Sequence, residues 1–323
     1  MQDMTPTLLE ARRDYITWRK SQGYKPATIK NDEIVIRRLA EVVGWESPMT
    51  SINGGHMQQL LDARHTSPTT CNMRRAHLSM LFKYSRSMGF VPPDFDPLLN
   101  TRKRPVPEVE RKRVDRESIR DLIEGADSPR ERILLAVGLN LCLRISEVSD
   151  LRIRDIDLNA RRVSVRVFKT GVVDNMPMTQ ELEKELRRYI TWYTLQVGEL
   201  KPDYYLIPST WQEKKLMPHK PMSRPADAIK RNLQRIGWDD VRGEGGHTLR
   251  RTGARWILMS LESEGEERAM RVVQQLLHHK TLSQTEHYLG ITVDKEHRDR
   301  VLTGTRWYTA EDDENVINLR RAQ

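Results

Sequence analysis

Apolar residues recur at helical spacing in two stretches of the first hundred residues. The first stretch follows Thr28, a candidate N-cap, and comprises Ile29, Ile36, Leu39, Ala40 and Val43. The second comprises Met73, Ala76, Met80, Leu81 and Tyr84. Residues three, four and seven apart share one side of an α-helix, so each stretch predicts an amphipathic helix. We therefore expect a small helical domain over residues 1–98.

A period of two appears further along the chain. Val163, Val165 and Val167 alternate with polar residues, and Lys169-Thr170-Gly171 is typical of a turn. Met176-Pro177-Met178 follows in a segment that can return beside the first. Because side chains alternate between the two faces of a strand, this pattern predicts a small antiparallel sheet near residues 162–180.

The C-terminal third favours helices again. One is expected to begin near Thr248, after the glycine-rich Gly243-Glu244-Gly245-Gly246, with Leu249, Trp256, Ile257 and Met259 toward a core. A second carries the apolar stripe Ala269, Val272, Val273, Leu276 and Leu277, which ends at His278-His279-Lys280. Two overlapping capping-box patterns, Thr281 with Gln284 and Ser283 with Glu286, predict a third helix with Tyr288 in its first turns.

Length and charge indicate a two-domain protein with a polyanionic partner. The 323 residues suit two domains. Pro97 to Arg116 is the candidate boundary, because Thr101-Arg102-Lys103-Arg104-Pro105-Val106-Pro107 interrupts helical patterning. Lys plus Arg number 54 against 45 Asp plus Glu, a net charge of +9, and the pI is about 9.6. This excess favours nucleic acid, although a merely soluble basic protein would show it too.

Basic residues on the predicted surface are candidates for DNA contact. They are Arg74, Arg75, Lys83 and Arg86 on the second helix and Arg102, Lys103 and Arg104 in the linker. For any one of them, an ordinary solvated basic face is the competing interpretation. The two cysteines, Cys71 and Cys142, argue for a reducing compartment. Without an 18-residue apolar run or a signal peptide, the expected location is the cytoplasm, with no membrane partner.

Six residues supply a coherent chemistry. They are Arg144, Lys169, His247, Arg250, His279 and Tyr288. Together they offer a phenolic nucleophile, three cations to hold a phosphate and two imidazoles to move protons, which is what a tyrosine needs to attack a phosphodiester. Nine histidines and two cysteines form no CxxC or HExxH pattern, so no metal site and no cofactor are expected.

Each of these residues also has an ordinary structural interpretation. Arg144 and Glu147 could form a solvated pair on a helix, and the His247–Arg250 spacing occurs on many basic helix faces. Lys169 could be a solvated turn lysine. A tyrosine such as Tyr288 in an amphipathic helix more often packs than reacts. The functional interpretation therefore depends on the residues occurring together.

With these motifs in place, the chain resembles a tyrosine recombinase of the phage-integrase type, from about Thr5 to about Gly290. Leu143-Arg144-Ile145-Ser146-Glu147 resembles the first arginine box of that family, and His247-Thr248-Leu249-Arg250-Arg251-Thr252 resembles its HxLRxT box. The segment from Leu276 to Tyr288 resembles the one that ends in the nucleophile. The joint occurrence in this order is highly specific.

Two positions depart from the family pattern. His278 stands where the family usually has glycine immediately before the last histidine, and Cys142 stands where a small residue, often glycine, is usual. His278 therefore leaves open which imidazole enters the site. The nine-residue spacing to Tyr288 favours His279.

The resemblance implies a mainly α fold with a small antiparallel β-sheet, as a helical core-binding domain and an α+β catalytic domain. We expect the core-type DNA-binding domain at 1–98, a basic linker at 99–113, the catalytic domain at 114–290 and a subunit-docking tail at 291–323. It also implies that Tyr288 forms a 3′-phosphotyrosine while Arg144 and Arg250 neutralise the phosphate. Lys169 would protonate the leaving 5′-oxygen, His247 would accept the tyrosine proton, and His279 would orient or stabilise charge.

The implied partners are double-stranded DNA recombination sites and other copies of the chain, as a tetramer on DNA. A directionality factor and a host DNA-bending protein are additional candidates. The absence of an N-terminal arm-binding module suggests a simple crossover site. An integrase of a phage or mobile element is favoured over a Xer-type chromosome-dimer resolvase, a topoisomerase-like enzyme and a non-catalytic DNA-binding protein. Tyr308 is a rival nucleophile by position alone.

Overall fold

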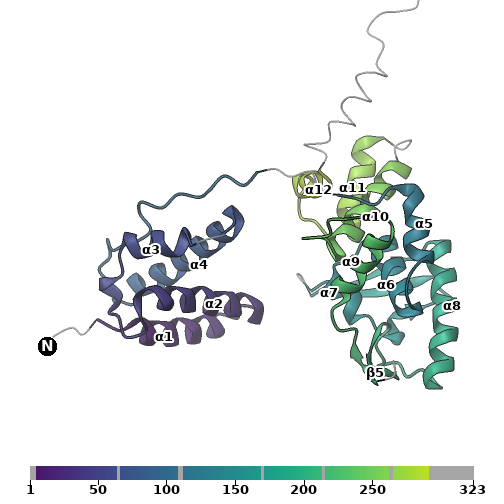
Figure 1. Ribbon diagram of the computed structural model, residues 1–323, viewed down its shortest axis with the longest axis horizontal. Helices are drawn as coiled ribbons and strands as arrows, with labels where there is room; N and C mark the ends of the chain where they lie inside the picture. Colours follow the sequence, from purple (N-terminus) through teal and green to yellow (C-terminus); the bar gives the residue numbers. More distant parts are fainter. Residues whose placement is uncertain are drawn as a thin grey trace, which may run out of the picture. The chain divides into compact units, whose positions relative to one another are not determined.

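The computed structural model describes residues 5–63, 66–107, 112–168, 171–212, 215–261 and 265–290. The chain divides into two compact units, Met1–Glu108 and Val109–Gln323, each with its own apolar core (Figure 1). Among the helices described, none is long and apolar enough to cross a membrane.

The first unit is helical. Its elements are α1 (Leu8–Ser21), α2 (Pro26–Val43), the 3₁₀ turn η1 (Met49–Ser51), α3 (Gly54–Leu61) and α4 (Pro68–Ser87). Helix α2 packs against the other three. It begins at Pro26 with Lys25 as its N-cap, so the prediction of Thr28 as the cap is wrong. Proline is favoured at the first helical position because its fixed φ suits a helix and its missing N–H needs no partner there.

Helix α4 turns a different face to the core from the one predicted. Met73 is 40 % exposed and Ala76 is also exposed, whereas Leu78 and Phe82 are completely buried. Leu81 and Tyr84 are buried as expected. The stripe was misjudged because α4 carries apolar residues on more than one side, and the neighbouring helices decide which side is covered.

A buried charged cluster joins three helices of the first unit. The carboxylate of Asp32 (α2) is completely buried and forms an ion pair with Arg19 (α1), whose Nε lies 3.0 Å from Oδ2. The pair is hydrogen-bonded through a second contact, in which Nη2 of Arg19 donates to Oδ1 over 3.3 Å. Nδ1 of His77 (α4) lies 2.6 Å from the same Oδ1. These contacts fix the relative positions of α1, α2 and α4 inside the unit.

The second unit is mainly helical with two small antiparallel sheets. Its elements are α5 (Arg116–Glu124), α6 (Pro129–Asn140), α7 (Ile145–Asp150), η2 (Ile153–Asp155), β1 (Ile156–Asp157), β2 (Arg162–Arg166), β3 (Val173–Pro177), α8 (Gln180–Val197), β4 (Pro208–Trp211), β5 (Lys215–Pro221), α9 (Pro225–Arg235), α10 (Gly246–Ser260), α11 (Glu266–Leu276) and α12 (Leu282–Leu289). The predicted fold class, mainly α with a small antiparallel sheet, is confirmed.

The predicted sheet is the three-stranded sheet β1-β2-β3. Val163 pairs with Met176 and Val165 pairs with Asp174 across β2 and β3. Both valines are completely buried, as their period-two spacing predicts. The second sheet, β4-β5, was not predicted, because Lys215–Pro221 lacks a clear alternation of apolar and polar residues.

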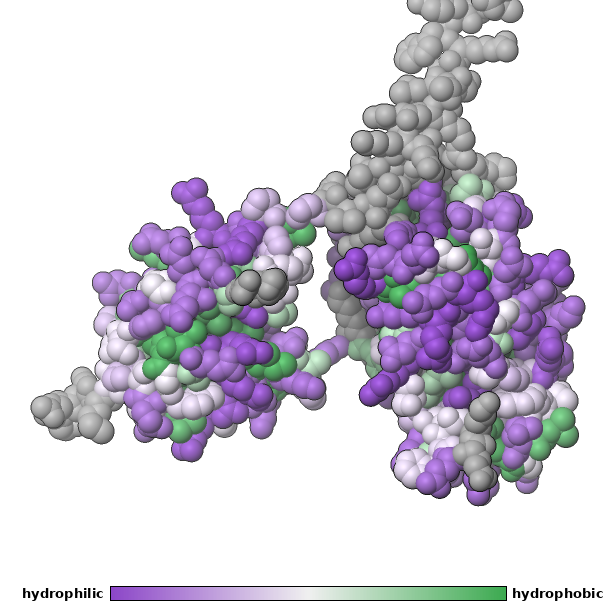
Figure 2. Space-filling view, in the orientation of Figure 1, coloured by the Kyte–Doolittle hydropathy of each residue, from purple (hydrophilic) through white to green (hydrophobic). Residues whose placement is uncertain are grey.

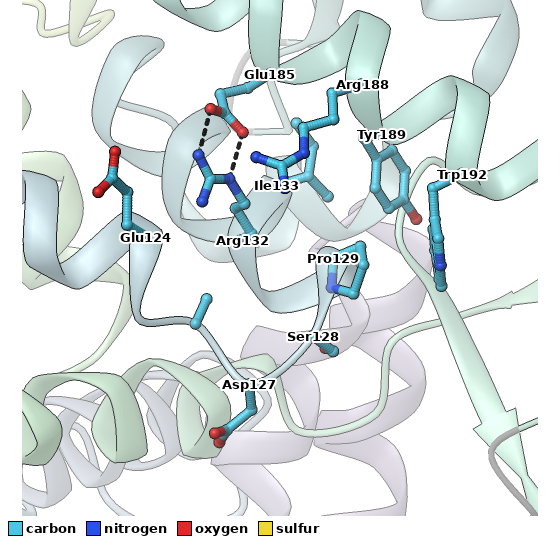
Figure 3. A pocket seen from close by; sticks show the side chains of 11 residues that line it. Glu124, Asp127, Ser128, Pro129, Arg132, Ile133, Glu185, Arg188, Tyr189 and Trp192 are labelled. Carbon is cyan, nitrogen blue, oxygen red and sulfur yellow. Dashed lines mark hydrogen bonds and ion pairs between the residues drawn. The ribbon is translucent and has the colours of Figure 1, made fainter.

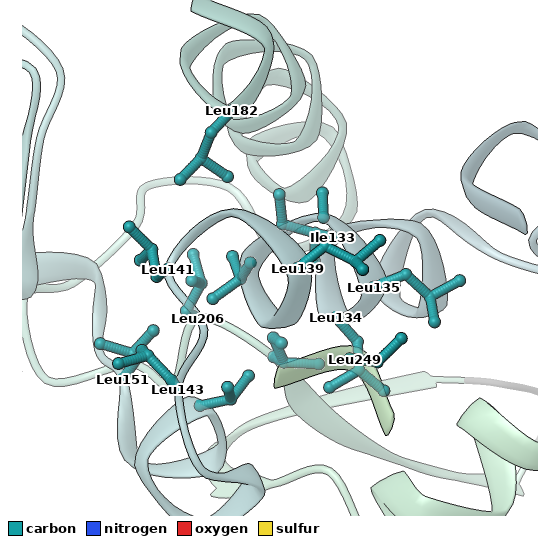
Figure 4. Close-up of a cluster of buried hydrophobic side chains, with 14 of the residues drawn as sticks. Ile133, Leu134, Leu135, Leu139, Leu141, Leu143, Leu151, Leu182, Leu206 and Leu249 are labelled. Carbon is teal, nitrogen blue, oxygen red and sulfur yellow. The ribbon is translucent and has the colours of Figure 1, made fainter. Parts of the chain in front are cut away.

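Helix α6 is the centre of this unit. It is apolar on nearly every side, as expected of a helix covered all round, and packs against α5, α7, α8, α9 and α10. Figure 4 shows its leucines among Leu182 of α8, Leu206 and Leu249 of α10. The chain leaves α6 through Leu141 and Leu143, both buried, and reaches Arg144 directly afterwards.

Glycines bring α10 unusually close to the end of α6. A Cβ on Gly253 would lie 1.9 Å from the carbonyl oxygen of Leu139, and a Cβ on Gly246 would lie 2.6 Å from Cβ of Ile145. These two glycines are seven residues apart and therefore share one face of α10. Their missing side chains allow α10 to lie directly against the segment that carries Arg144.

Helix α10 also holds the first residues of the second unit. Nε of Arg251 donates to the carbonyl oxygen of Lys112 over 3.0 Å, and Oγ1 of Thr252 accepts from the backbone N–H of Val114 over 3.0 Å. The indole of Trp256 donates to the carbonyl oxygen of Val114. The chain therefore enters this unit along the helix that carries His247 and Arg250.

Candidate active site

Arg144 is the N-cap residue of α7 and is fixed by a buried carboxylate. Its backbone N–H donates to Oε2 of Glu147 over 2.9 Å, and its Nη1 donates to Oε1 over 3.0 Å. The Glu147 side chain is completely buried, whereas that of Arg144 is 25 % exposed. The competing interpretation of a solvated Arg144–Glu147 pair is right that the two residues pair but wrong about solvation, because the carboxylate lies in the interior. It holds a guanidinium that a phosphate can still reach.

Arg250 lies behind Arg144 with a side chain that is 1 % exposed. Its Nη1 donates to the carbonyl oxygen of Cys142 over 2.6 Å, and its Nη2 donates to the carbonyl oxygen of Leu277. Nη1 also lies 3.8 Å from Oε2 of Glu147. Burial lowers the pKa of Arg250, and the positive charge of Arg144 lowers this pKa further. The two guanidiniums therefore share one buried carboxylate.

Tyr288 comes from the second turn of α12 and lies against the start of α10. Its hydroxyl donates to the carbonyl oxygen of His247 over 3.1 Å, and the two rings are 6.2 Å apart between centroids. Cζ of Arg250 lies 5.9 Å from the tyrosine ring centre. The residue is 9 % exposed. The phenol of Tyr288 from α12 thus lies beside an imidazole and a guanidinium of α10, near the N-terminus of that helix.

His279 is the imidazole beside the tyrosine. Its ring centroid lies 5.4 Å from that of Tyr288, with the ring planes at 82°. Nδ1 lies 3.1 Å from Oγ1 of Thr285, a completely buried residue of α12. This hydrogen bond sets the orientation of the ring. His278 does not share this position.

The backbone at His278 explains why glycine is usual there. Helix α11 ends with the N–H of His278 bonded to the carbonyl oxygen of Gln275 and the N–H of His279 bonded to that of Gln274. This is a Schellman motif, in which the residue after the helix adopts the left-handed conformation. His278 does so with a φ of 49°, at a cost of roughly 1–2 kcal/mol for a residue with a side chain.

Cys142, the other departure from the family pattern, has the same kind of backbone, with a φ of 48°. Its side chain is completely buried, and its carbonyl oxygen accepts from Arg250. Burial raises the pKa of its thiol to about 12. Both departures therefore put an ordinary side chain where the backbone favours glycine, directly beside the site.

Three features of the site were not predicted or cannot be placed. Glu147 was recognised as a partner of Arg144 but not as a buried carboxylate shared by two arginines. Thr285 was missed, and no sequence signal distinguishes it from the neighbouring threonines. Lys169, which falls between β2 and β3 in the sequence, lies outside the described residues. Tyr308 and the whole tail at 291–323 also lie outside them.

The predicted DNA contacts have mixed surroundings. Arg74 donates to the carbonyl oxygen of Leu60, Arg75 to Thr101, and Arg86 to the carbonyl oxygen of Phe95, while Arg104 pairs with Asp62. These four are half-buried and support the fold of the first unit. Lys83, Arg102 and Lys103 are exposed. Hydrophilic residues also dominate the visible face of the second unit in Figure 2.

A cavity of about 310 Å³ lies apart from these residues, between α6 and α8. Its walls include Tyr189, Trp192 and Arg188, and Arg132 forms two hydrogen bonds of 2.6 Å with Glu185 at its edge (Figure 3). None of the arginines, histidines or tyrosine described above lines it. Among the described residues, no cluster of His, Cys, Asp and Glu could hold a metal ion.

Known proteins resemble the chain in sequence. The model of the phage integrase family matches residues 112–295. The tyrosine recombinase XerA of Thermococcus kodakarensis is 24% identical over 290 residues, which cover 88% of this chain and 92% of that protein. XerD of Ralstonia nicotianae is 29% identical over 244 residues, covering 72% and 73%. XerA of Pyrococcus furiosus is 27% identical over 191 residues, so the chain spans 60% of the length of that relative and 58% of its own.

Solved structures share the fold. A lambda integrase (75-356) dimer bound to a COC′ core site has a TM-score of 0.66 at 19% identity, covering 86% of this chain and 97% of that one. The Tn1549 transposon integrase in complex with circular intermediate DNA has a TM-score of 0.64 at 17% identity, covering 92% and 99%. With more than half of its length matched by the family model, the chain belongs to the phage integrase family of tyrosine recombinases.

Proposed function

We propose that this protein is a site-specific DNA recombinase that integrates or excises a phage or another mobile element. The observation that carries the proposal is that His247, His279 and Arg250 surround Tyr288, while Arg144 shares the buried Glu147 carboxylate with Arg250. Such an arrangement can bind a phosphate, supply a nucleophile and move its proton. Membership of the phage integrase family supports the same activity.

In the proposed cleavage step, Oη of Tyr288 attacks the scissile phosphorus in line with the 5′-oxygen. The Oη–P bond forms as the P–O5′ bond breaks, which leaves a 3′-phosphotyrosine and a free 5′-hydroxyl. The guanidiniums of Arg144 and Arg250 stabilise the charge on the non-bridging oxygens. His247 accepts the tyrosine proton, Lys169 donates a proton to the 5′-oxygen, and His279 donates a hydrogen bond to the phosphate.

The energy of the phosphodiester is retained in the tyrosine link. A 5′-hydroxyl of a second DNA strand can therefore reverse the step onto a new partner, without ATP. Two successive exchanges pass through a Holliday junction. In the described state the tyrosine hydroxyl donates to the carbonyl oxygen of His247, so it must exchange this bond for the phosphate before it attacks.

Substrate and assembly follow from the same proposal. The helical domain at 1–98 and the linker at 99–113 grip double-stranded recombination sites, through Lys83, Arg102 and Lys103 and through any of the half-buried arginines that DNA can reach. The domain at 114–290 cuts, and the tail at 291–323 docks on a neighbouring copy in a tetramer. A directionality factor or a DNA-bending host protein joins this assembly. The reaction takes place in the cytoplasm, at the nucleoid.

A Xer-type resolvase of chromosome dimers is the second candidate. The observation in its favour is that several relatives in sequence are Xer recombinases, among them XerA of Thermococcus kodakarensis. The Tn1549 transposon integrase, which shares the fold, favours a mobile element instead. The DNA site distinguishes the two, because an integrase acts at the ends of its element and a resolvase acts at one chromosomal locus.

The test is to trap an SDS-resistant protein–DNA adduct from nicked genomic fragments, with the unsubstituted chain beside Tyr288→Phe, and to sequence the attached DNA. We expect an adduct that the substitution abolishes, at sites that flank a mobile element. Attached DNA from one chromosomal locus would support the resolvase. Salt-sensitive DNA binding without an adduct from either protein would contradict a recombinase and indicate a non-catalytic DNA-binding protein.

A further inference from the structure

His278 stands beside the active site but takes no part in the mechanism above. It has a left-handed backbone that favours glycine, and its side chain is largely buried, at 16 % exposure. Its ring leaves the α11–α12 turn toward the β2–β3 hairpin, whereas the ring of the next residue, His279, lies against Tyr288. A residue with a strained backbone and a directed side chain is a candidate for a specific role.

The side chain of His278 contacts one carboxylate. Its Nε2 lies 2.8 Å from Oδ2 of Asp174, in strand β3. An ionised carboxylate can only accept, so Nε2 carries the proton and donates it. Nδ1 is buried and has no hydrogen-bond partner. The Asp174 contact is therefore the polar interaction that directs this imidazole.

Asp174 belongs to the hairpin whose connection carries Lys169. It pairs with Val165 across β2 and β3, so its position is fixed with that of the whole hairpin. The backbone of Val167 exchanges hydrogen bonds with Val172 and Gly171 at the end of the strands. Lys169 follows Val167 by two residues. A contact on β3 thus restrains the two strands that flank the connection containing Lys169.

We propose that His278 and Asp174 are positioning residues that tie the β2–β3 hairpin, whose connection includes Lys169, to the turn bearing His279, and that this tie serves protonation of the leaving 5′-oxygen by Lys169. The inference rests on the proposed function. In a chain with glycine at position 278, this link between the two segments would be absent. With histidine at this position, the turn has a strained backbone but gains a side-chain contact with the hairpin.

The consequence concerns one half of the cleavage reaction. The His278–Asp174 contact involves none of Tyr288, Arg144 and Arg250, the residues that attack and bind the phosphate in the proposed mechanism. Loss of the contact should leave nucleophilic attack intact and impair protonation of the leaving group. A DNA strand with sulfur in place of the bridging 5′-oxygen separates these effects, because a thiolate leaves without a proton from a general acid.

The test measures single-turnover cleavage of a nicked suicide duplex that contains the site recovered from the adduct, once with the 5′-oxygen and once with 5′-sulfur. For Asp174→Ala and His278→Gly we expect cleavage of the oxygen substrate to slow by about tenfold to a hundredfold, as for a displaced general acid. On the sulfur substrate both variants should match the unsubstituted chain, as should Lys169→Ala. Asp174→Asn, which keeps an acceptor oxygen, should retain most of the activity.

Two further variants sharpen the test. The double variant Asp174→Ala with His278→Gly should be no slower than the slower single variant, because both remove the same contact. Asp203→Ala is the matched control, since Asp203 pairs with His219 over 3.4 Å elsewhere in the unit. It should cleave both substrates at the unsubstituted rate.

The outcomes separate this inference from the proposed function. If the unsubstituted chain cleaves neither substrate, the proposed function fails. If it cleaves both and the two single variants lose equal activity on oxygen and sulfur, the contact is merely structural and the inference fails. Unchanged cleavage of the oxygen substrate by both variants would also overturn it.

Discussion

The hydroxyl of Tyr288 donates a hydrogen bond to the backbone carbonyl oxygen of His247 over 3.1 Å. These residues are 41 positions apart, one near the end of α12 and the other at the start of α10. Their contact places the proposed nucleophile beside its proposed proton acceptor. Tyr288 also belongs to the apolar cluster that packs α11 and α12 on α10, so the fold of this region positions the hydroxyl.

Replacing Arg250 with lysine should slow covalent adduct formation by about 10²–10³-fold, as for loss of one oxyanion donor. A lysine cannot reproduce the planar fork that donates to the carbonyl oxygens of Cys142 and Leu277 at once. Arg144→Lys should act in the same direction. Single-turnover cleavage measures the effect, with Arg120→Lys as the control because that side chain is 79 % exposed. Equal cleavage rates for all three variants would show that neither Arg144 nor Arg250 acts in the cleavage reaction.

Gly253→Ala should destabilise the second unit and impair cleavage together. The added Cβ would lie 1.9 Å from the carbonyl oxygen of Leu139, so α10 must move away from α6. Such overpacking costs about 1–3 kcal/mol, and α10 carries both His247 and Arg250. Urea unfolding and adduct formation measure the two effects. Gly54→Ala is the matched control, because its Cβ would meet its nearest neighbour at 3.8 Å. A Gly253→Ala protein of unchanged stability would contradict the close approach.

Cys142 should make stability depend on alkaline pH. Burial raises the pKa of its thiol from 9.0 to about 12, so the folded state keeps a proton that the unfolded chain releases. This contribution is complete below pH 9 and is lost as the pH rises from 9 toward 12. In that window the free energy of unfolding should fall by about 1.4 kcal/mol per pH unit relative to Cys142→Ala. If urea unfolding shows that the free energy of unfolding changes with pH in the same way in both proteins, the thiol does not contribute.

The buried pair of Arg19 and Asp32 should matter more than any exposed pair. Asp32→Ala leaves a buried guanidinium without its carboxylate and should cost about 3–5 kcal/mol in the free energy of unfolding. The exposed pair Arg38–Glu41 serves as the control, with a loss of about 0–1 kcal/mol for Glu41→Ala. The double variant Arg19→Met with Asp32→Leu should recover stability, because it removes both charges. If the double variant loses as much free energy of unfolding as Asp32→Ala, the loss comes from packing and not from the unpaired charge.

Local sequence patterns predicted many of the helices and strands, but they did not always predict which side of a helix is buried. The period-two valines predicted β2 and its sheet, and the capping pattern at Thr281 predicted α12. Helix α4 was predicted, but its buried face was not, because tertiary contacts chose Leu78 and Phe82 over Met73 and Ala76. The half-buried arginines of the first unit show the same limit, since charge alone does not indicate which guanidiniums bind backbone carbonyl oxygens.

Spacing and order identified the candidate site more fully than they identified its support. The nine-residue interval selected His279, whose ring lies against Tyr288. The burial of Glu147 and the contact of His278 with Asp174 depend on distant segments meeting in space. The contact of Thr285 with His279, six residues away, depends on how the α11–α12 turn folds. These contacts have no local sequence signal. Lys169 and the DNA contacts stay predictions.

The most direct measurement of the central claim is mass spectrometry of the trapped adduct after nuclease and protease digestion. We predict a nucleotide joined through its 3′-phosphate to the tyrosine of the peptide that contains Tyr288. Attachment to Tyr308, to another residue or through a 5′-phosphate would contradict the account.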